Sequence, residues 1–209
     1  MKFKLNKINE VLDQKDWDYT NKILYRMCRE RFDHKDDENI LAKIWIIGRT
    51  YAAAIERRKN KKDSDDTDSF AIKKVVPAIK KSKIDEKLDG IKGFNKISRN
   101  KLFEILQVHK DLQNVFYRIT KLKKRSLASK YLHFHLPELF YIYDSRSANK
   151  VRNLKIKIPK GLEKIINSNK VDKVYAQFYI KAFLQCEEIY QEHKKKLSPR
   201  DMDKLLLSL

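Results

Sequence analysis

The chain has 209 residues, with 48 Lys and Arg against 28 Asp and Glu, and its formal net charge is +20. An apolar content of 42% is enough for one core of ordinary domain size, which argues against general disorder. Only four Gly and four Pro occur, which argues against turn-rich sandwiches and Gly-rich phosphate loops and favours an all-α fold.

The two cysteines, Cys28 and Cys186, lack the partner spacing of a disulfide framework, a zinc site or an iron–sulfur cluster. We therefore expect no metal and no cofactor. The sequence contains no run of about 18 apolar residues, and its first residues lack the apolar core of a signal peptide. We expect a cytoplasmic protein that does not enter a membrane.

The positive charge is concentrated after Phe70. Residues 1–70 carry a net charge of +2, whereas the rest of the chain carries +18. Nucleic-acid-binding proteins gather Lys and Arg where phosphates lie, so this division favours a polyanionic partner. The alternative is that Lys-rich usage reflects a genome of low GC content. The densest basic clusters are 121–125 and 146–160, and they flank residues 131–145, which contain no Lys or Arg.

Helical spacing of apolar residues begins in the N-terminal part, which we place at 1–69. A helix is predicted over 17–32 and another over 39–58. On the second helix Trp45, Arg49 and Glu56 form a stripe beside the core face. This stripe is either an edge of packing with an internal ion pair or the wall of a pocket. The residues predicted to form the inner face of the first helix are Tyr19, Ile23, Leu24, Met27 and Phe32, and those of the second are Leu41, Ile44, Gly48, Tyr51 and Ile55.

A polar loop at 59–69 separates this part from the remainder of what we expect to be one domain, 1–209. Asp144 occupies the N-cap position of a helix that reaches about Val151, and Ser198 with Pro199 opens the last helix. The other predicted helices are short stretches within 71–88, 98–119 with a possible new cap at Asp111, 126–135, and 171–196 with Val174, Tyr175, Phe178, Ala182, Cys186 and Ile189 inward.

The block 121–154 combines a basic turn, a short helix, an apolar connection, an Asp at a helix N-cap and a basic helix. It resembles the helix–hairpin–helix DNA glycosylase superfamily, in which a catalytic Asp caps the helix after the hairpin. The chain is also similar to uncharacterised bacterial proteins with an oxoguanine-glycosylase-like fold, in the stretches 47–58, 126–147 and 197–206. The resemblance implies an all-α, two-lobed fold with a hairpin-like, Asp-bearing region at 98–154.

The resemblance implies that Asp144 is catalytic and that the partner is DNA, most often double-stranded. The hairpin position lacks the usual glycines, so side chains or the amides at Ser126 would have to contact phosphate. Ser126 also stands where strand-cleaving members carry a nucleophilic Lys, and we expect Lys124 and Lys130 to point elsewhere. The implied enzyme is therefore a glycosylase without lyase activity. The expected DNA contacts are Lys121, Lys123, Lys124, Arg125, Ser126, Arg146 and Lys150.

The residues also fit this chemistry by type. A carboxylate can stabilise the oxocarbenium-like sugar that forms when an N-glycosidic bond breaks, and it can orient or deprotonate water. Asp144 is the only acid between Glu138 and Glu163. A base taken out of the stack needs a pocket. The expected lining residues are Tyr131, His135, Tyr141 and Tyr143, with the stripe of Trp45, Arg49 and Glu56.

Three interpretations stay open at this point. The first is a monofunctional DNA base glycosylase, and the second is a noncatalytic DNA-binding protein on the same scaffold. In the second, Asp144 is only an N-cap and the tyrosines are core residues. The third is a protein with an RNA or protein partner, whose charge reflects genome composition.

Overall fold

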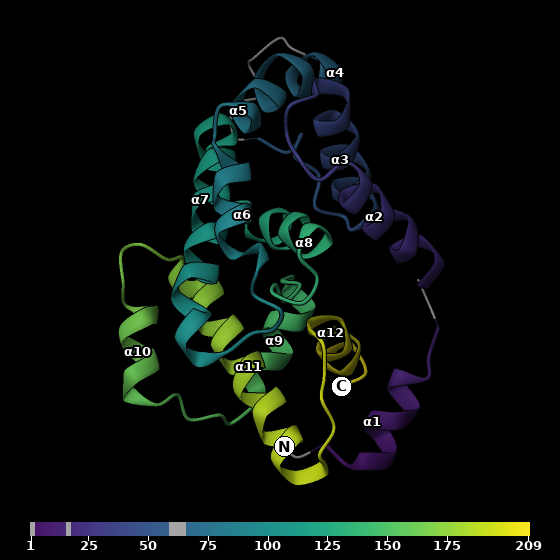
Figure 1. Cartoon of the computed structure of the whole chain (residues 1–209), viewed down its shortest axis with the longest axis vertical. Coiled ribbons are helices and arrows are strands. Elements are labelled where there is room, and N and C mark those ends of the chain that lie inside the picture. Colours follow the sequence, from purple (N-terminus) through teal and green to yellow (C-terminus); the bar gives the residue numbers. More distant parts are fainter. Residues whose placement is uncertain (1–2, 16–17, 59–65) are drawn as a thin grey trace.

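The structure is a computed structural model that describes residues 3–15, 18–58 and 66–209. The regular structure of these residues is entirely helical, with no strand, so the predicted all-α class is confirmed. Figure 1 shows the arrangement of the helices. In chain order they are α1 (Leu5–Leu12), α2 (Asp18–Glu30), α3 (Asp37–Thr50), α4 (Thr67–Phe70), the π-helical η1 (Ala71–Val75), α5 (Val76–Lys80), α6 (Ile84–Lys92), the 3-10 turn η2 (Arg99–Lys101), α7 (Leu102–Thr120), α8 (Arg125–His135), α9 (Ser145–Asn153), α10 (Lys160–Ile166), α11 (Lys173–His193) and α12 (Pro199–Leu207).

Packing between helices falls into two groups. In the first, α8 packs against α2, α3 and α7, and α3 also packs against α5. In the second, α9 packs against α11 and α12, while α1 lies on α12 and α10 on α11. The long helix α7 contacts both α8 and α11, so it joins the two groups. The segment that links α8 to α9 carries Asp144 from the first group to the second.

The two ends of the described chain lie close together (Figure 1). The ring of His193, at the end of α11, lies with Nε2 2.9 Å from the carbonyl oxygen of Phe3. Lys204 of α12 donates to the carbonyl of Gln14 at 2.6 Å. These contacts attach the N-terminal segment to the second group of helices.

The helix predicted over 39–58 is wrong in its second half, because α3 ends at Thr50. Ala52 adopts a left-handed conformation with φ of 50°, and the amide of Ala53 donates to the carbonyl of Gly48 at 2.7 Å. The chain thereby turns back over the end of α3. Alanine favours helices, so this ending has a tertiary cause, which the contacts of Lys124 and Lys130 described below supply.

The predicted inner face of α2 is also wrong in part. Tyr19 is 79% exposed and Ile23 is 42% exposed, whereas Asn21, Leu24 and Cys28 are buried. The helix is therefore rotated so that a polar residue lies inside and an aromatic residue lies outside.

Other predictions need smaller corrections. Helix α7 is continuous through Asp111, which forms an ion pair with Lys87 and caps no helix. Val174 of α11 was predicted to point inward, but it is 45% exposed, because the helix buries Tyr175 and Phe178 instead. The predicted loop at 59–69 falls mostly on residues 59–65, which lie outside the described residues, but its last three residues belong to α4, so that end of the prediction is wrong.

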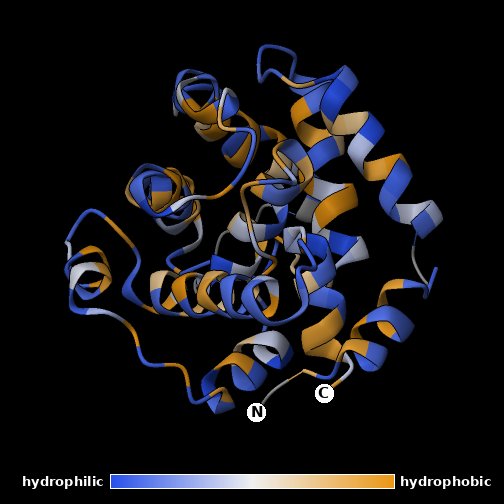
Figure 2. Cartoon of the chain, turned by 60° about the horizontal axis from the view of Figure 1, so that its bottom comes forward, coloured by the Kyte–Doolittle hydropathy of each residue, from blue (hydrophilic) through white to orange (hydrophobic). Residues whose placement is uncertain are grey.

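Hydrophobic residues recur at intervals along the helices, between polar ones (Figure 2). This is the pattern of helices that bury one face against a shared core. No described helix is both long enough and apolar enough to cross a lipid bilayer.

Candidate functional site around Asp144

Asp144 caps α9, as predicted. Its backbone is extended, with φ of −146°, and its Oδ1 accepts a hydrogen bond from the amide of Ser147 at 2.9 Å. In return the Asp144 amide donates to the hydroxyl oxygen of Ser147 at 3.1 Å. This reciprocal capping box fixes the position of the carboxyl group at the start of the helix.

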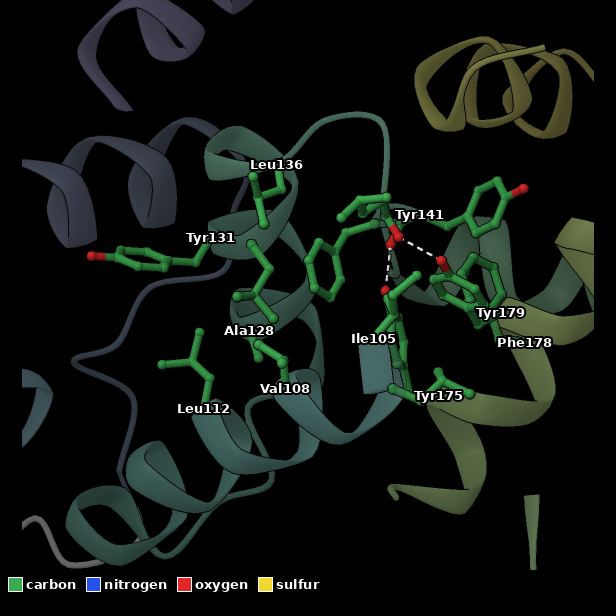
Figure 3. Packing of buried hydrophobic residues seen from close by; sticks show 14 of the residues in the cluster. Ile105, Val108, Leu112, Ala128, Tyr131, Leu136, Tyr141, Tyr175, Phe178 and Tyr179 are labelled. Carbon is green, nitrogen blue, oxygen red and sulfur yellow. Dashed lines mark hydrogen bonds between the residues drawn. The ribbon is translucent and has the colours of Figure 1, made fainter. Parts of the chain in front are cut away.

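The segment before Asp144 is held by side chains from α11 and α8. The hydroxyl of Tyr175 donates to the carbonyl of Tyr141 at 2.9 Å, and that of Tyr179 donates to the carbonyl of Leu139 at 2.5 Å (Figure 3). The amide of Tyr143 donates to the hydroxyl oxygen of Ser129 at 3.0 Å. These buried bonds satisfy the backbone of a segment that has no helix of its own, so Asp144 stands on a rigid support.

The second carboxylate oxygen of Asp144 faces Lys130. The Oδ2 atom lies 3.8 Å from Lys130 Nζ, and the two side chains are 29% and 4% exposed, respectively. Lys130 also donates to the carbonyl of Tyr51 at 3.0 Å. Burial lowers the pKa of Lys130, and the Asp144 carboxylate opposes that shift. Lys130 was expected to point away from the position of the nucleophile, and its ammonium group lies between the Asp144 carboxylate and the Tyr51 carbonyl.

Helix α12 brings a second carboxyl group into the same electrostatic environment. Burial raises the pKa of Asp203 to about 6 against the opposing charge of Arg200, and Asp144 adds to the rise. Arg200 donates from Nη1 to Asp203 Oδ2 at 2.6 Å. Within the described chain, Asp203 Oδ1 and Arg200 Nε have no hydrogen-bond partner. We call Asp144, Lys130, Asp203 and Arg200 the Asp144 corner.

Sequence reasoning missed Lys130, Asp203 and Arg200 as members of this corner. The stretch 197–206 was already noted as part of the family resemblance, and it contains Arg200 and Asp203. Their spacing of three residues on a helix allows the ion pair, but nothing local indicates that it meets Asp144.

Tyr131 and His135 do not form the predicted pocket near Asp144. Tyr131 is fully buried, and its hydroxyl lies 2.7 Å from His34 Nε2, whose Nδ1 is 2.5 Å from Asp85. His135 stacks on His34 with ring centroids 5.2 Å apart. Figure 3 shows the Tyr131 ring pointing away from Tyr141. Both residues belong to a sealed cluster between α8 and the turn after α2, so this part of the site prediction is corrected.

Tyr141 is also a core residue. It is 3% exposed, and its ring packs edge-on against Tyr179 with centroids 4.9 Å apart. Tyr143 is different, because it is half-buried and lines a cavity of about 220 Å³ between α9 and α11. Arg152 and Lys181 line the same cavity, which makes it a cationic pocket with an aromatic wall.

Trp45, Arg49 and Glu56 lie together as predicted, and they contact one another. The Arg49 guanidinium lies 4.8 Å from the centroid of the Trp45 ring and 3.0 Å from Glu56 Oε1. Glu56 lies in the loop after α3, so the three residues meet through a turn and do not follow one helix. Among the described residues, no hydrogen bond or ion pair connects this stripe to Asp144. It fits the packing interpretation better than a pocket wall.

The predicted phosphate contacts divide into exposed and internal side chains. Lys121, Lys123 and Arg146 are exposed, Lys150 is half-buried, and no described residue forms an ion pair with any of them. Ser126 is half-buried in the first turn of α8, where its amide is available at the helix N-terminus.

Lys124 and Arg125 are used internally, which corrects their predicted role. Lys124 donates to the carbonyl of Ala54 at 2.8 Å, and burial lowers its pKa to about 8. Arg125 donates from Nε to Asp172 at 2.5 Å, and Asp172 caps α11 and accepts from Gln113. Both cations therefore hold the start of α8 against neighbouring segments.

No family model matches the sequence, and comparisons with curated proteins and with solved structures find no match either. The described residues contain no group of three His, Cys, Asp or Glu side chains placed to hold a metal ion.

Proposed function

We propose that the protein binds DNA and hydrolyses the N-glycosidic bond of a modified base with Asp144, on a two-lobed scaffold of the helix–hairpin–helix glycosylase type. The observation that carries this proposal is that the two oxygens of the Asp144 carboxyl group have different partners. Its Oδ1 is fixed by the capping box, while its Oδ2 faces a buried ammonium group and the side chain remains 29% exposed. A carboxylate that served only as a cap would need no cation beside its other oxygen.

The proposed reaction uses Asp144 as the group that takes a proton from water. The water oxygen bonds to the sugar carbon as the bond between that carbon and the base nitrogen breaks. The base leaves with the electron pair and takes a proton from solvent. The ammonium group of Lys130 lies 3.8 Å from Asp144 Oδ2 and helps to hold the carboxylate in place, and the carboxylate in turn stabilises the positive charge that develops on the sugar.

Strand cleavage through a Schiff base is not part of the proposal. The position expected for a nucleophile carries Ser126, and Lys130 is 4% exposed with its ammonium group bonded to the Tyr51 carbonyl. A nucleophilic amine has to be neutral and has to reach the sugar. We expect no covalent complex with DNA on addition of borohydride.

Phosphate contacts are assigned to exposed cations on both sides of Asp144. Lys121 and Lys123 precede it on the turn before α8, and Arg146 follows it in the first turn of α9. Lys150 lies one turn further along α9 than Arg146. These side chains would bring the backbone of bound DNA to the carboxylate.

Asp144→Asn is the decisive variant, because asparagine caps helices about as well as aspartate. We expect base release from a panel of duplexes with deaminated, oxidised or alkylated bases to fall at least 100-fold, while the melting temperature stays close to that of the wild type. The matched control is Asp36→Asn at the N-cap of α3, where Asp36 accepts from the amide of Asn39 at 3.0 Å. This control should leave base release unchanged.

A noncatalytic DNA-binding protein is the second candidate. The sealing of Tyr131 and His135 in the core favours it, because two of the predicted base-pocket residues are absent from the neighbourhood of Asp144. If the wild type binds duplex DNA but releases no base from any member of the panel, this second function replaces the first.

A further inference from the structure

Helix α2 presents an exposed stripe of one aromatic, one aliphatic and three cationic side chains. Lys22 and Ile23 lie three and four residues after Tyr19, and Arg26 and Arg29 each follow after a further three residues, so the five side chains share one face of the helix. All five are exposed, and together with Tyr25 they line a hollow of about 480 Å³. We call these five residues the α2 stripe.

The cations of the α2 stripe are not neutralised within the described chain. Lys22, Arg26 and Arg29 form no ion pair with any described residue, and the described residues that line the hollow include no acid. By contrast, the exposed Lys80 and Arg99 have acidic partners in Asp37 and Glu187. Three unpaired cations along about 10 Å of helix form a local positive field that fits a line of phosphates.

The aromatic end of the stripe distinguishes it from a simple basic patch. Tyr19 is 79% exposed, and Ile23, one turn further on, is 42% exposed. An exposed ring next to cations provides a face on which an unpaired base can stack, whereas a paired base in a duplex keeps its faces covered by its neighbours. The stripe is therefore better suited to single-stranded than to double-stranded nucleic acid.

The stripe is fixed to the rest of the molecule through the other face of α2. The ring nitrogen Nδ1 of His133 lies 2.7 Å from the carbonyl of Phe140 and can only donate there, so Nε2 accepts from the hydroxyl of Tyr25 at 2.7 Å. On the same helix the side-chain oxygen of Asn21 accepts a hydrogen bond from the hydroxyl of Tyr51. The backbone carbonyl of Tyr51 in turn accepts a hydrogen bond from the ammonium group of Lys130. A short series of contacts thus connects α2 to the partner of Asp144.

We infer that the α2 stripe binds an unpaired stretch of a DNA strand, with one base stacked on Tyr19 and consecutive phosphates at Lys22, Arg26 and Arg29. The identity of the polymer as DNA rests on the proposed function, whereas the surface itself is argued from α2. A duplex with a displaced base has such a stretch at the lesion, so the stripe would hold the strand while Asp144 acts on the sugar. Figure 1 shows α2 at the outer edge of the molecule, where a strand can reach it.

The test measures binding of a 15-nucleotide oligothymidine and of a 15-base-pair duplex by fluorescence anisotropy at several salt concentrations. In the triple variant K22Q/R26Q/R29Q, we expect the slope of log affinity against log salt for the single strand to fall by about 2, because about 0.7 is lost for each phosphate contact. Tyr19→Ala should weaken single-strand binding about tenfold, and Tyr19→Phe should restore it.

The matched control is K4Q/K81Q/K170Q, which removes the same charge from exposed lysines on three other parts of the surface. If this control reduces the salt slope as much as the α2 triple variant does, or if Tyr19→Ala has no effect, the inference is wrong. Binding to anionic phospholipid vesicles that depends on the stripe, without any effect on single-stranded DNA, would also overturn it. If the wild type binds neither oligonucleotide, the proposed function fails as well.

Discussion

Among the residues that the structure describes, two lysines are almost completely buried, and they have different surroundings. Lys43, on α3, donates to three carbonyls of the turn after α2, those of Arg31, Phe32 and Asp33, at 2.7 to 3.3 Å. Lys130, on α8, donates to one carbonyl and faces the carboxylate of Asp144 at 3.8 Å. The ammonium group of Lys43 therefore has a hydrogen-bond acceptor for each of its three N–H donors, whereas that of Lys130 has an acceptor within hydrogen-bond distance for one donor.

The comparison separates a structural lysine from one that acts on a neighbouring charge. The carbonyls around Lys43 are neutral, so they provide hydrogen bonds but no ion pair, and burial lowers the pKa of this lysine to about 8. Lys130 has one neutral carbonyl as its hydrogen-bond partner, and it also faces an acid that is still 29% exposed. We therefore expect the turn after α2 to depend on Lys43 for stability, and the Asp144 corner to depend on Lys130 for its electrostatics.

Lys43→Met should have the largest effect on stability. The substitution keeps the volume roughly constant but removes the charged donor of three part-buried hydrogen bonds, and a bond to a charged group contributes about 1.5 to 3 kcal/mol. We expect the free energy of unfolding, measured by urea denaturation, to fall by about 4 kcal/mol. The control is Lys81→Met at an exposed position. A loss below about 1 kcal/mol would show that the turn holds its shape without this lysine.

The second prediction concerns pH. Burial lowers the pKa of His109 and of His133 to about 4, below the ordinary value of 6.5. Below pH 6.5 the unfolded chain therefore binds protons that the folded chain does not, and stability falls as the pH falls. Between pH 7 and pH 5 each histidine should remove about 2 kcal/mol from the free energy of unfolding.

Asp203 should oppose this loss. Its pKa is raised to about 6, so between pH 6 and its ordinary value of 3.8 the folded chain binds a proton that the unfolded chain does not, and stability rises as the pH falls. This contribution is about 1 kcal/mol between pH 7 and pH 5. Urea denaturation at both pH values should show a smaller loss in His133→Gln and a larger loss in Asp203→Asn than in the wild type. Equal losses in the three proteins would contradict the assignment of these groups.

Features with a local cause could be predicted from the sequence. The cap at Asp144 is signalled by the following Ser147, and the last helix by Ser198 and Pro199, because each cap involves residues within one turn. The long amphipathic helices α7 and α11 were found by their spacing. Three short α-helices, α1, α4 and α10, were not predicted. The seven residues of α10 give too few turns for a clear period.

Features that depend on distant residues could not be predicted. The end of α3 is stabilised by Lys124 and Lys130, which reach carbonyls 70 and 79 residues earlier in the chain. Tyr131 has the residue type of a base-stacking group, but the turn after α2 and Asp85 of α6 enclose it. The exposed Tyr19 is the opposite case, because its spacing matched a buried face and only the packing of α2 on α8 places it outside.

Lys130→Met should have the smallest effect on stability. Breaking a fully buried ion pair by removing one partner costs about 3 to 5 kcal/mol, but water can reach Asp144, and its Oδ1 keeps the bonds from Ser147. The main loss is then the bond to the Tyr51 carbonyl, so we expect a decrease of about 1 kcal/mol in the free energy of unfolding. A double-mutant cycle with Asp144→Asn should give a coupling energy below about 1 kcal/mol. A loss as large as that of Lys43→Met would mean that Lys130 is also a structural lysine, and the distinction between the two regions would disappear.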